Sequence, residues 1–378
     1  MGQLLAGALR VALVGLTLPA SIATPSQDGD LIRGDQWHLP FLHIDAVHLI
    51  SQGEGVIVAV PDTGVDAHPD LRVNLLDGTD VISGGSGDGR RDRDSHGTSM
   101  AGLIAAHGKE NKQGALGIAP EAKILPILDT PPGGIGDPDA LASGVEFAIA
   151  KGADVISISA VAGASVRLQQ AIKAAQDADI LVIAAAGNRP SDTGVRYPAS
   201  EEGVIAVGGI GRDGLHAAVS VTGSKIDVVA PAVDIYSTSY DGKYSKGTGT
   251  SSATAIVAGA AALIRSKYPY LPAREVAHRL TATAVDKGPP GRDDEYGYGV
   301  IDLVAALTAD VPPLGFESVS APADAGPTTF GAQPGDDGDG ATARGLVTLG
   351  VILAAGVGWA VVARRRRRGD DPPPRISR

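Results

Sequence analysis

Between about residue 50 and residue 308, short apolar runs rich in Val and Ile alternate with longer stretches of helical periodicity. The apolar runs carry little polar alternation, which is typical of strands that are covered on both faces. Strand–helix–strand alternation predicts an α/β fold in which a mostly parallel central sheet has helices on both faces. The expected strands are 56–60, 123–128, 154–159, 180–185, 204–207 and 226–229, and the expected helices are 137–151, 166–179, 252–267 and 272–286.

Composition excludes several classes of functional site. None of the 378 residues is cysteine, which rules out disulfide scaffolds, thiolate zinc sites, iron–sulfur clusters and cysteine nucleophiles. The formal net charge of -11 argues against a basic surface for nucleic acid. Aromatic residues make up 4% of the chain, which argues against a platform that stacks bases. We therefore expect no nucleic-acid partner.

The N-terminal end predicts export. Residues 1–23 have the pattern of a secretory signal peptide, with Arg10, an apolar run at 11–18, and small residues at Ser21 and Ala23 for a cleavage site. An uncleaved anchor is the alternative, although the apolar run is short for a membrane span.

The C-terminal end predicts a membrane anchor. Residues 345–363 carry no charge and would extend ~28 Å as a helix, close to the thickness of a bilayer core. Five arginines follow at 364–368, and cationic residues cluster on the cytoplasmic side of membranes. A solvated tail or a nucleic-acid arm is the alternative for the arginine run. The pattern predicts a single-pass transmembrane helix in the cell membrane, with a basic tail, 364–378, in the cytoplasm and residues 24–344 outside the cell.

Two segments connect the predicted globular domain, 50–308, to these ends. Residues 309–344 are rich in Pro, Gly and Asp without periodicity, which predicts a flexible stalk. Residues 24–49 carry apolar side chains at intervals, among them Trp37, Leu39 and Phe41. We expect this N-terminal extension to dock on the domain, and a disordered leader is the alternative.

Four polar residues stand at predicted strand ends or helix starts, the places where parallel sheets bind ligands. Asp62 follows the first strand, His96 begins an apolar helical run, Asn188 follows the strand at 180–185, and Ser251 lies in a glycine-rich loop before a long helix. Each has a structural alternative when it is taken alone. The alternatives are a turn cap for Asp62, a structural histidine for His96, a left-handed turn residue for Asn188 and a helix N-cap for Ser251.

Together, these residue types predict nucleophilic catalysis by serine. A serine hydroxyl is a weak nucleophile and needs an adjacent base, which a histidine such as His96 supplies near neutral pH. A buried carboxylate, Asp62, would hold the imidazole and stabilise its charged form, while the amide of Asn188 would donate to an oxyanion. The order Asp, His, Ser along the chain is the order found in subtilisin.

Five segments resemble the subtilisin-like serine proteases, or subtilases: VAVPDTGVDAHPDL, DSHGTSMAGLIAA, ISISAVAG, IAAAGN and GTSSATAIVAG. The succession of signal, short leader, protease, stalk, membrane helix and arginine tail is similar to that of the mycosins, membrane-anchored subtilases associated with type VII secretion. The resemblance implies a serine endopeptidase that acts on a protein or peptide substrate, with type VII secretion machinery as a partner. The residues that it implies are catalytic Asp62, His96 and Ser251, oxyanion donor Asn188, and substrate-binding Ser159, Ala160 and Gly187.

The sequence departs from the subtilase pattern at the cleft. Subtilases usually carry glycines after the serine of the substrate-binding strand, whereas Ala160, Val161 and Ala162 follow Ser159 here. The isopropyl group of Val161 would crowd a cleft in which the substrate backbone pairs as a strand. An alternative function is therefore a structural partner of a secretion complex, with catalysis secondary or lost. Ala255 also replaces a proline that is common after the nucleophile, which would alter a helix kink and leave the chemistry unchanged.

We expect no cofactor and no metal site. Many subtilases bind calcium, and Asp88, Asp92 and Asp94 are candidates for a structural calcium site. These aspartates alternate with arginines, so a solvated charged loop is the preferred interpretation.

Overall fold

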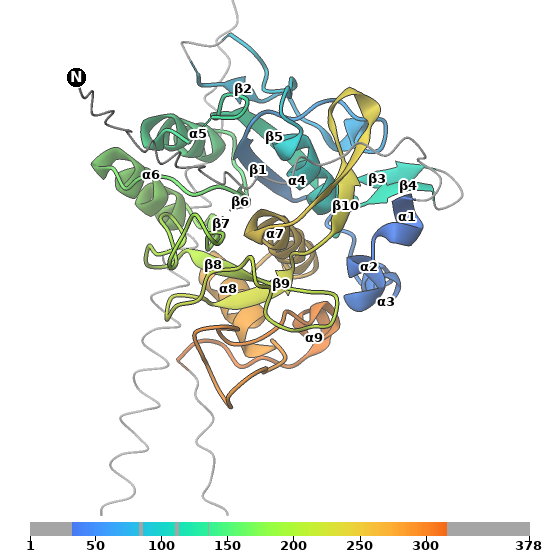
Figure 1. The fold of residues 1–378 in the computed structure, drawn as a ribbon, viewed down its shortest axis with the longest axis vertical. Helices are drawn as coiled ribbons and strands as arrows, with labels where there is room; N and C mark the ends of the chain where they lie inside the picture. Colours follow the sequence, from blue (N-terminus) through green and yellow to red (C-terminus); the bar gives the residue numbers. More distant parts are fainter. Residues whose placement is uncertain (1–31, 83–85, 110–112, 135, 316–378) are drawn as a thin grey trace, which may run out of the picture. The chain divides into compact units, whose positions relative to one another are not determined.

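The computed structural model describes residues 32–82, 86–109, 113–134 and 136–315 (Figure 1). Within these ranges, seven parallel strands form a central sheet in the order β2-β5-β1-β6-β7-β8-β9. The prediction of a mostly parallel α/β sheet is confirmed, and each expected strand has its counterpart. The edge strand β2 was not expected, because it is only two residues long. The strands are β1 (Ile57–Asp62), β2 (Thr79–Asp80), β5 (Lys123–Leu128), β6 (Val155–Ile158), β7 (Leu181–Ala185), β8 (Ile205–Ile210) and β9 (Val228–Pro231).

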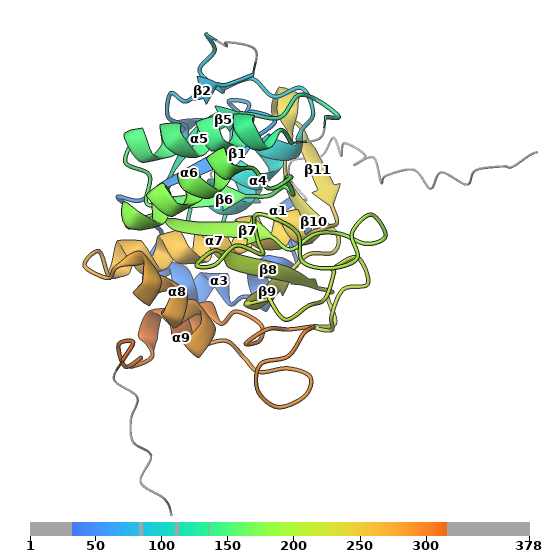
Figure 2. The same cartoon turned by 90° about the vertical axis from the view of Figure 1, so that its left-hand side faces the viewer.

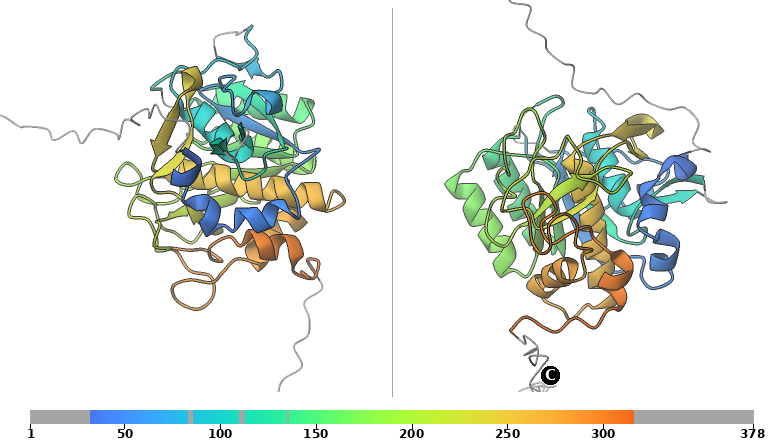
Figure 3. Two further views of the ribbon diagram at one scale, coloured as in Figure 1. Left: turned by 90° about the vertical axis from the view of Figure 1, so that its right-hand side faces the viewer. Right: turned by 60° about the horizontal axis from the view of Figure 1, so that its bottom comes forward.

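Helices cover both faces of this sheet, as Figures 2 and 3 show from opposite sides. On one face lie α5 (Pro138–Ala150) and α6 (Val166–Asp177), and on the other lie α4 (His96–Ala105) and α7 (Thr250–Lys267). Successive residues of β1 enter different cores: Val58 and Val60 pack with α4 and α7, whereas Ala59 packs with α5 and α6. Both faces of the strand are therefore apolar, which explains its lack of polar alternation.

The helix boundaries follow local signals, with two informative differences. The expected start of α5 is confirmed, because the Asp137 side chain accepts from the main-chain N–H of Asp139 at 2.9 Å, with Pro138 in the first turn. Helix α7 begins at Thr250, two residues before the expected start at 252, so Ser251 lies in its first turn. Helix α8 (Ala273–Ala282) ends before the expected 286, because the chain leaves the helix and residues 285 and 300 pair as an antiparallel bridge.

The first described segment packs against the domain through short helices α1 (Ile32–Asp35), α2 (His38–Phe41) and α3 (Ile44–His48). Gln36 is fully buried, and its side-chain amide bonds to both the N–H and the C=O of Leu116 and to the C=O of Tyr236. The indole N–H of Trp37 donates to the C=O of Val233 at 2.9 Å. These bonds attach the segment to two hairpins, β3 (His107–Lys109) with β4 (Gln113–Leu116) and β10 (Ile235–Thr238) with β11 (Tyr244–Gly247).

The last described helix is α9 (Leu303–Thr308), and two single turns, Arg72–Asn74 and Tyr240–Gly242, complete the described elements. The predicted signal peptide at 1–23, most of the predicted stalk (316–344), the predicted transmembrane helix at 345–363 and the basic tail at 364–378 lie outside the described residues. Among the helices that the structure describes, none is long and apolar enough to cross a membrane.

Candidate active site

Asp62 and His96 meet at the carboxyl end of the sheet. Asp62 is the last residue of β1, and its side chain is buried; His96 is the first residue of α4. Nδ1 of His96 lies 2.8 Å and 2.9 Å from the two carboxylate oxygens of Asp62. The close approach depends on Gly97, because a Cβ there would lie 2.1 Å from the carbonyl oxygen of Gly64. The sequence thus permits the start of a helix to touch the end of a strand.

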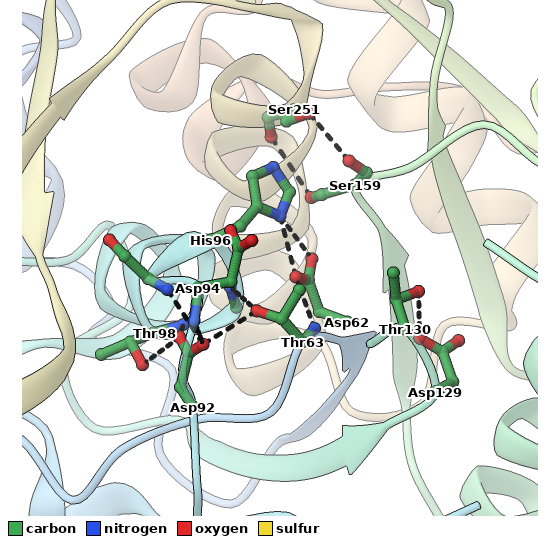
Figure 4. Close-up of polar contacts among 12 residues, drawn as sticks. Asp62, Thr63, Asp92, Asp94, His96, Thr98, Asp129, Thr130, Ser159 and Ser251 are labelled. Carbon is green, nitrogen blue, oxygen red and sulfur yellow. Dashed lines mark hydrogen bonds and ion pairs between the residues drawn. The ribbon is translucent and has the colours of Figure 1, made fainter. Parts of the chain in front are cut away.

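The contact with Asp62 favours the charged form of the His96 imidazole. Burial of the His96 ring opposes a positive charge, but the Asp62 carboxylate, with help from Asp94 and Asp92, raises the pKa of His96 to about 9. The ring is 36% exposed, so solvent weakens these attractions without reversing their direction. In Figure 4 the ring lies between Asp62 and Ser251, with its second nitrogen on the side of the serine.

Ser251 lies in the first turn of α7, directly above His96 in Figure 4. It is not the N-cap, which is Gly249, so the structural alternative for Ser251 is wrong. Its hydroxyl donates to the C=O of Ser159 at 2.7 Å, and the Ser159 hydroxyl donates in return to the C=O of Ser251 at 3.3 Å. The hydroxyl is thus directed at the carbonyl group that directly follows β6.

Asn188 follows β7 and is fixed by the start of α7. Its side-chain oxygen accepts from the N–H of Thr250 at 2.9 Å and from the Thr250 hydroxyl at 3.2 Å. These two bonds involve only the side-chain oxygen. Among the described residues, none accepts a hydrogen bond from the side-chain NH2 group. Asn188 is not in the left-handed conformation, so that alternative is also wrong. A free donor therefore stands next to Ser251.

The expected substrate-binding residues lie at the ends of the two neighbouring strands β6 and β7. Ser159 is buried directly after β6, and Ala160 and Val161 are partly exposed beyond it. Gly187 follows β7 with φ +120, and a Cβ there would lie 3.0 Å from the Asp192 carboxylate. The structure thus brings Ser159 and Gly187 to the edge of the sheet where Ser251 lies, with the isopropyl group of Val161 at its surface.

The three aspartates considered for calcium do not form a cluster. In the described part of the chain, no group of three or more His, Asp or Glu side chains could hold a metal ion. Asp88 and Asp94 are exposed, as expected for a solvated loop. Asp92 is only 4% exposed, so the interpretation as a solvated loop is wrong for this residue.

One buried carboxyl group near the site was not expected. Asp129 follows β5, is 4% exposed, and its N–H donates to the C=O of Asp62 at 3.0 Å. Burial, followed by the charge of Asp62, raises the pKa of Asp129 to about 8, against a smaller opposing effect of the Thr130 hydroxyl. An acidic residue directly after a buried strand, as at Asp62, is the signal that could have found it.

Residues 53–299 match the model of the Peptidase S8 subtilase family. The chain belongs to this family. Mycosin-1 of Mycobacterium tuberculosis is 34% identical over 387 residues, which cover 85% of this chain and 83% of mycosin-1. Subtilisin DY of Bacillus licheniformis is 39% identical over 71% of this chain and 97% of its own length. This subtilase is therefore a serine endopeptidase, as the sequence predicted.

Comparison with solved structures also shows similarity to mycosins. The crystal structure of MycP1 from Mycobacterium smegmatis is 30% identical, with a TM-score of 0.66 over 79% of this subtilase and 92% of that chain. The MycP3 protease from the type VII (ESX-3) secretion system is 33% identical, with a TM-score of 0.65 over 72% of this subtilase and 88% of that chain. The resemblance to mycosins is thereby confirmed.

Proposed function

We propose that this subtilase cleaves peptide bonds with an Asp62, His96 and Ser251 triad, outside the cytoplasm, anchored to the membrane and in association with type VII secretion. The observation that carries the proposal is the contact of His96 Nδ1 with the Asp62 carboxylate at 2.8 Å, on the same sheet edge as the Ser251 hydroxyl.

The proposed reaction begins when the Ser251 hydroxyl turns from Ser159 toward Nε2 of His96. Its oxygen attacks the peptide carbonyl while Nε2 takes its proton, and the Asp62 carboxylate stabilises the resulting imidazolium. The tetrahedral oxyanion accepts from the Asn188 amide and from the N–H of Ser251, which lies in a first helical turn and lacks a partner within the helix. His96 then gives the proton to the leaving amine, and water hydrolyses the acyl-enzyme by the same steps.

The substrate backbone would lie along the ends of β6 and β7. The main chain at Ser159, Ala160 and Gly187 offers the hydrogen-bonding groups that an extended peptide needs to add as a strand. Val161 narrows this edge relative to glycine, so we expect slower cleavage of substrates with bulky side chains there. No step of the proposal uses a cofactor, and activity that persists in excess EDTA would support this.

The test compares the detergent-solubilised full-length protein with its Ser251→Ala form on a peptide library. We expect cleavage to fall by a factor of about 10⁶, the loss known for the nucleophile of subtilisin itself. Labelling by a fluorophosphonate should disappear with the same substitution. Equal cleavage by the two forms would refute the assignment of the nucleophile.

The association with secretion is supported by the likeness to mycosin-1 over most of the chain and to MycP3, which comes from a type VII system. Complementing a deletion strain with Ser251→Ala tests it against the alternative, a structural partner. Loss of secretion would favour proteolysis, and full rescue would favour the structural role. For the membrane anchor, we expect residues 24–344 to be accessible to externally added protease in intact cells and the arginine tail to be protected.

A further inference from the structure

We propose that Asp92 is a positioning residue. Through the hydroxyl of Thr63, it fixes the position of His96 relative to Asp62. The inference rests on the proposed function, because it assigns a role in orienting the triad. Asp92 lies in the loop before α4, and Thr63 directly follows β1.

The Asp92 carboxylate is buried and accepts five hydrogen bonds. One oxygen accepts from the Thr63 hydroxyl at 3.0 Å and from the main-chain N–H groups of Asp94 and Ser95 at 2.8 and 2.9 Å. The other oxygen accepts from the N–H and the hydroxyl of Thr98 at 3.0 and 2.6 Å. The donors come from the end of β1, from the loop and from the first turn of α4, so one side chain joins all three (Figure 4).

Thr63 connects this carboxylate to both members of the pair. Its N–H donates to the Asp62 carboxylate at 2.7 Å, and its hydroxyl oxygen accepts from the N–H of Gly97, next to His96, at 3.0 Å. The Thr63 hydroxyl has one proton. While its oxygen accepts from the N–H of Gly97, that proton needs a second partner that can accept it. An ionised Asp92 carboxylate is such a partner, because it has no proton to offer.

The start of α4 needs this support from outside the helix. Ser95, the N-cap, makes no capping bond with its own side chain and has φ +92, an unfavourable conformation for any residue other than glycine. The carboxylate of Asp92 instead accepts from Ser95 and Thr98, and its charge at a helix N-terminus is favourable. The N–H of Asp92 itself donates to the Asp66 carboxylate at 2.9 Å, which fixes the loop from its far side.

The hydrogen-bond network requires a carboxylate at 92 and a hydroxyl at 63. An asparagine at 92 would keep one acceptor oxygen and would present an NH2 group to N–H donors, so part of the network would be lost. A displacement of the His96 imidazole from the Asp62 carboxylate would lower the rate of the chemical step more than it would weaken substrate binding. A shift of ~1 Å can reduce a rate by ~10²-fold.

The experiment uses two matched pairs of variants in the full-length protein. Thr63→Val removes the hydroxyl and keeps the shape, while Thr63→Ser keeps the hydroxyl. Asp92→Asn removes the buried carboxylate, while Asp94→Asn removes a similar charge from an exposed residue that is even closer in sequence to His96. The measurements are kcat and KM for a cleaved peptide from pH 5 to 10, with melting temperature as a check on folding.

We expect Thr63→Val to lower the high-pH plateau of kcat by about 10²-fold with little change in KM, and Thr63→Ser to stay within about threefold of the unmodified protein. Asp92→Asn should lower the same plateau, whereas Asp94→Asn should shift only the midpoint of the profile to lower pH. Equal plateaus for Thr63→Val and Thr63→Ser would overturn the inference alone, even if Asp92→Asn fails to fold. Absence of Ser251-dependent cleavage in the unmodified protein would instead overturn the proposed function, and this inference with it.

Discussion

Replacing Asp62 with asparagine tests the electrostatics of the site most directly. The pKa of His96 rises from 6.5 to about 9 although burial opposes the charge, and the Asp62 carboxylate is the main cause of the rise. At ~1.36 kcal/mol per pKa unit, this shift corresponds to ~3 kcal/mol of net stabilisation of the charged imidazole, because the cost of burial is already subtracted from the attraction. The ring is 36% exposed, so we expect solvent screening to leave ~1–2 kcal/mol. In Asp62→Asn, the pKa of His96 should fall to 6.5 or below.

The effect on rate should be larger than this electrostatic energy. An asparagine NH2 in place of the carboxylate would donate to Nδ1 and place the remaining proton on Nε2, the tautomer that cannot accept from Ser251. We expect kcat/KM to fall by about 10⁴, in line with the loss of about 3 × 10⁴ in kcat that is known for subtilisin itself when its aspartate is removed.

The pH dependence follows from the direction of the shift. Catalysis needs a neutral imidazole, so kcat/KM of the unmodified protein should rise with pH through the pKa of about 9. Stability should change in the opposite sense. Because the folded pKa of His96 is above its unfolded value, the charged pair contributes fully below pH 6.5 and its contribution is lost as the pH rises toward 9.

The assay measures kcat/KM for a cleaved peptide and the denaturant midpoint at intervals from pH 5.5 to 10. The Asp62→Asn protein should have a lower pH midpoint of activity and a smaller decline in stability between pH 6.5 and 9. A variant with kcat/KM within tenfold of the unmodified protein, or with an unchanged pH profile, would refute the assignment of Asp62.

Three further substitutions test neighbouring features. Asn188→Ala should lower kcat by about 10²–10³ with little change in KM, as for the oxyanion donor of subtilisin itself, and steady-state kinetics would show it. Asp129→Asn should make the protein more stable than the unmodified form at pH 8–9 in denaturant titrations. Burial and then the charge of Asp62 raise the folded pKa of Asp129 from 3.8 to about 8, so the unmodified protein loses stability as the pH rises from 3.8 toward 8, and the asparagine variant does not. Gly97→Ala should lower kcat/KM by at least ~10²-fold, because its Cβ would meet the carbonyl oxygen of Gly64 and displace His96; unchanged kinetics would mean that the helix start can yield.

The central sheet could be predicted from the sequence because its signal is local. Strands such as β1 and β7 are buried on both faces, so nearly every residue in them is apolar. The hairpin of β10 and β11 gave no such signal. Its second strand reads Tyr-Ser-Lys-Gly, and it exists because its main chain pairs with β10 rather than because its side chains form an apolar face.

The four polar residues at strand ends and helix starts could be predicted for a similar reason, since the carboxyl ends of parallel strands and the starts of the helices that follow them share one edge of the sheet. Their orientation could not. The amide of Asn188 points as it does because Thr250, 62 residues later, holds its oxygen. Asp92 resembled a loop charge in sequence, because the donors that bury it come from Thr63 and from the first turn of α4, and only the fold brings them together.

The position of the Ser251 hydroxyl agrees with the charge of His96. An imidazolium has N–H donors on both nitrogens and cannot accept a hydrogen bond, so a serine facing it must donate elsewhere. The hydroxyl donates to the C=O of Ser159, at the edge where we propose that an extended substrate pairs. A substrate N–H that takes over this carbonyl would release the hydroxyl, and loss of the proton from His96 would give it a new acceptor. Binding of substrate and deprotonation of the His96 imidazole should therefore both favour the rotamer of Ser251 that directs its hydroxyl at His96. The contact with Ser159 in the absence of substrate is thus compatible with a functional nucleophile.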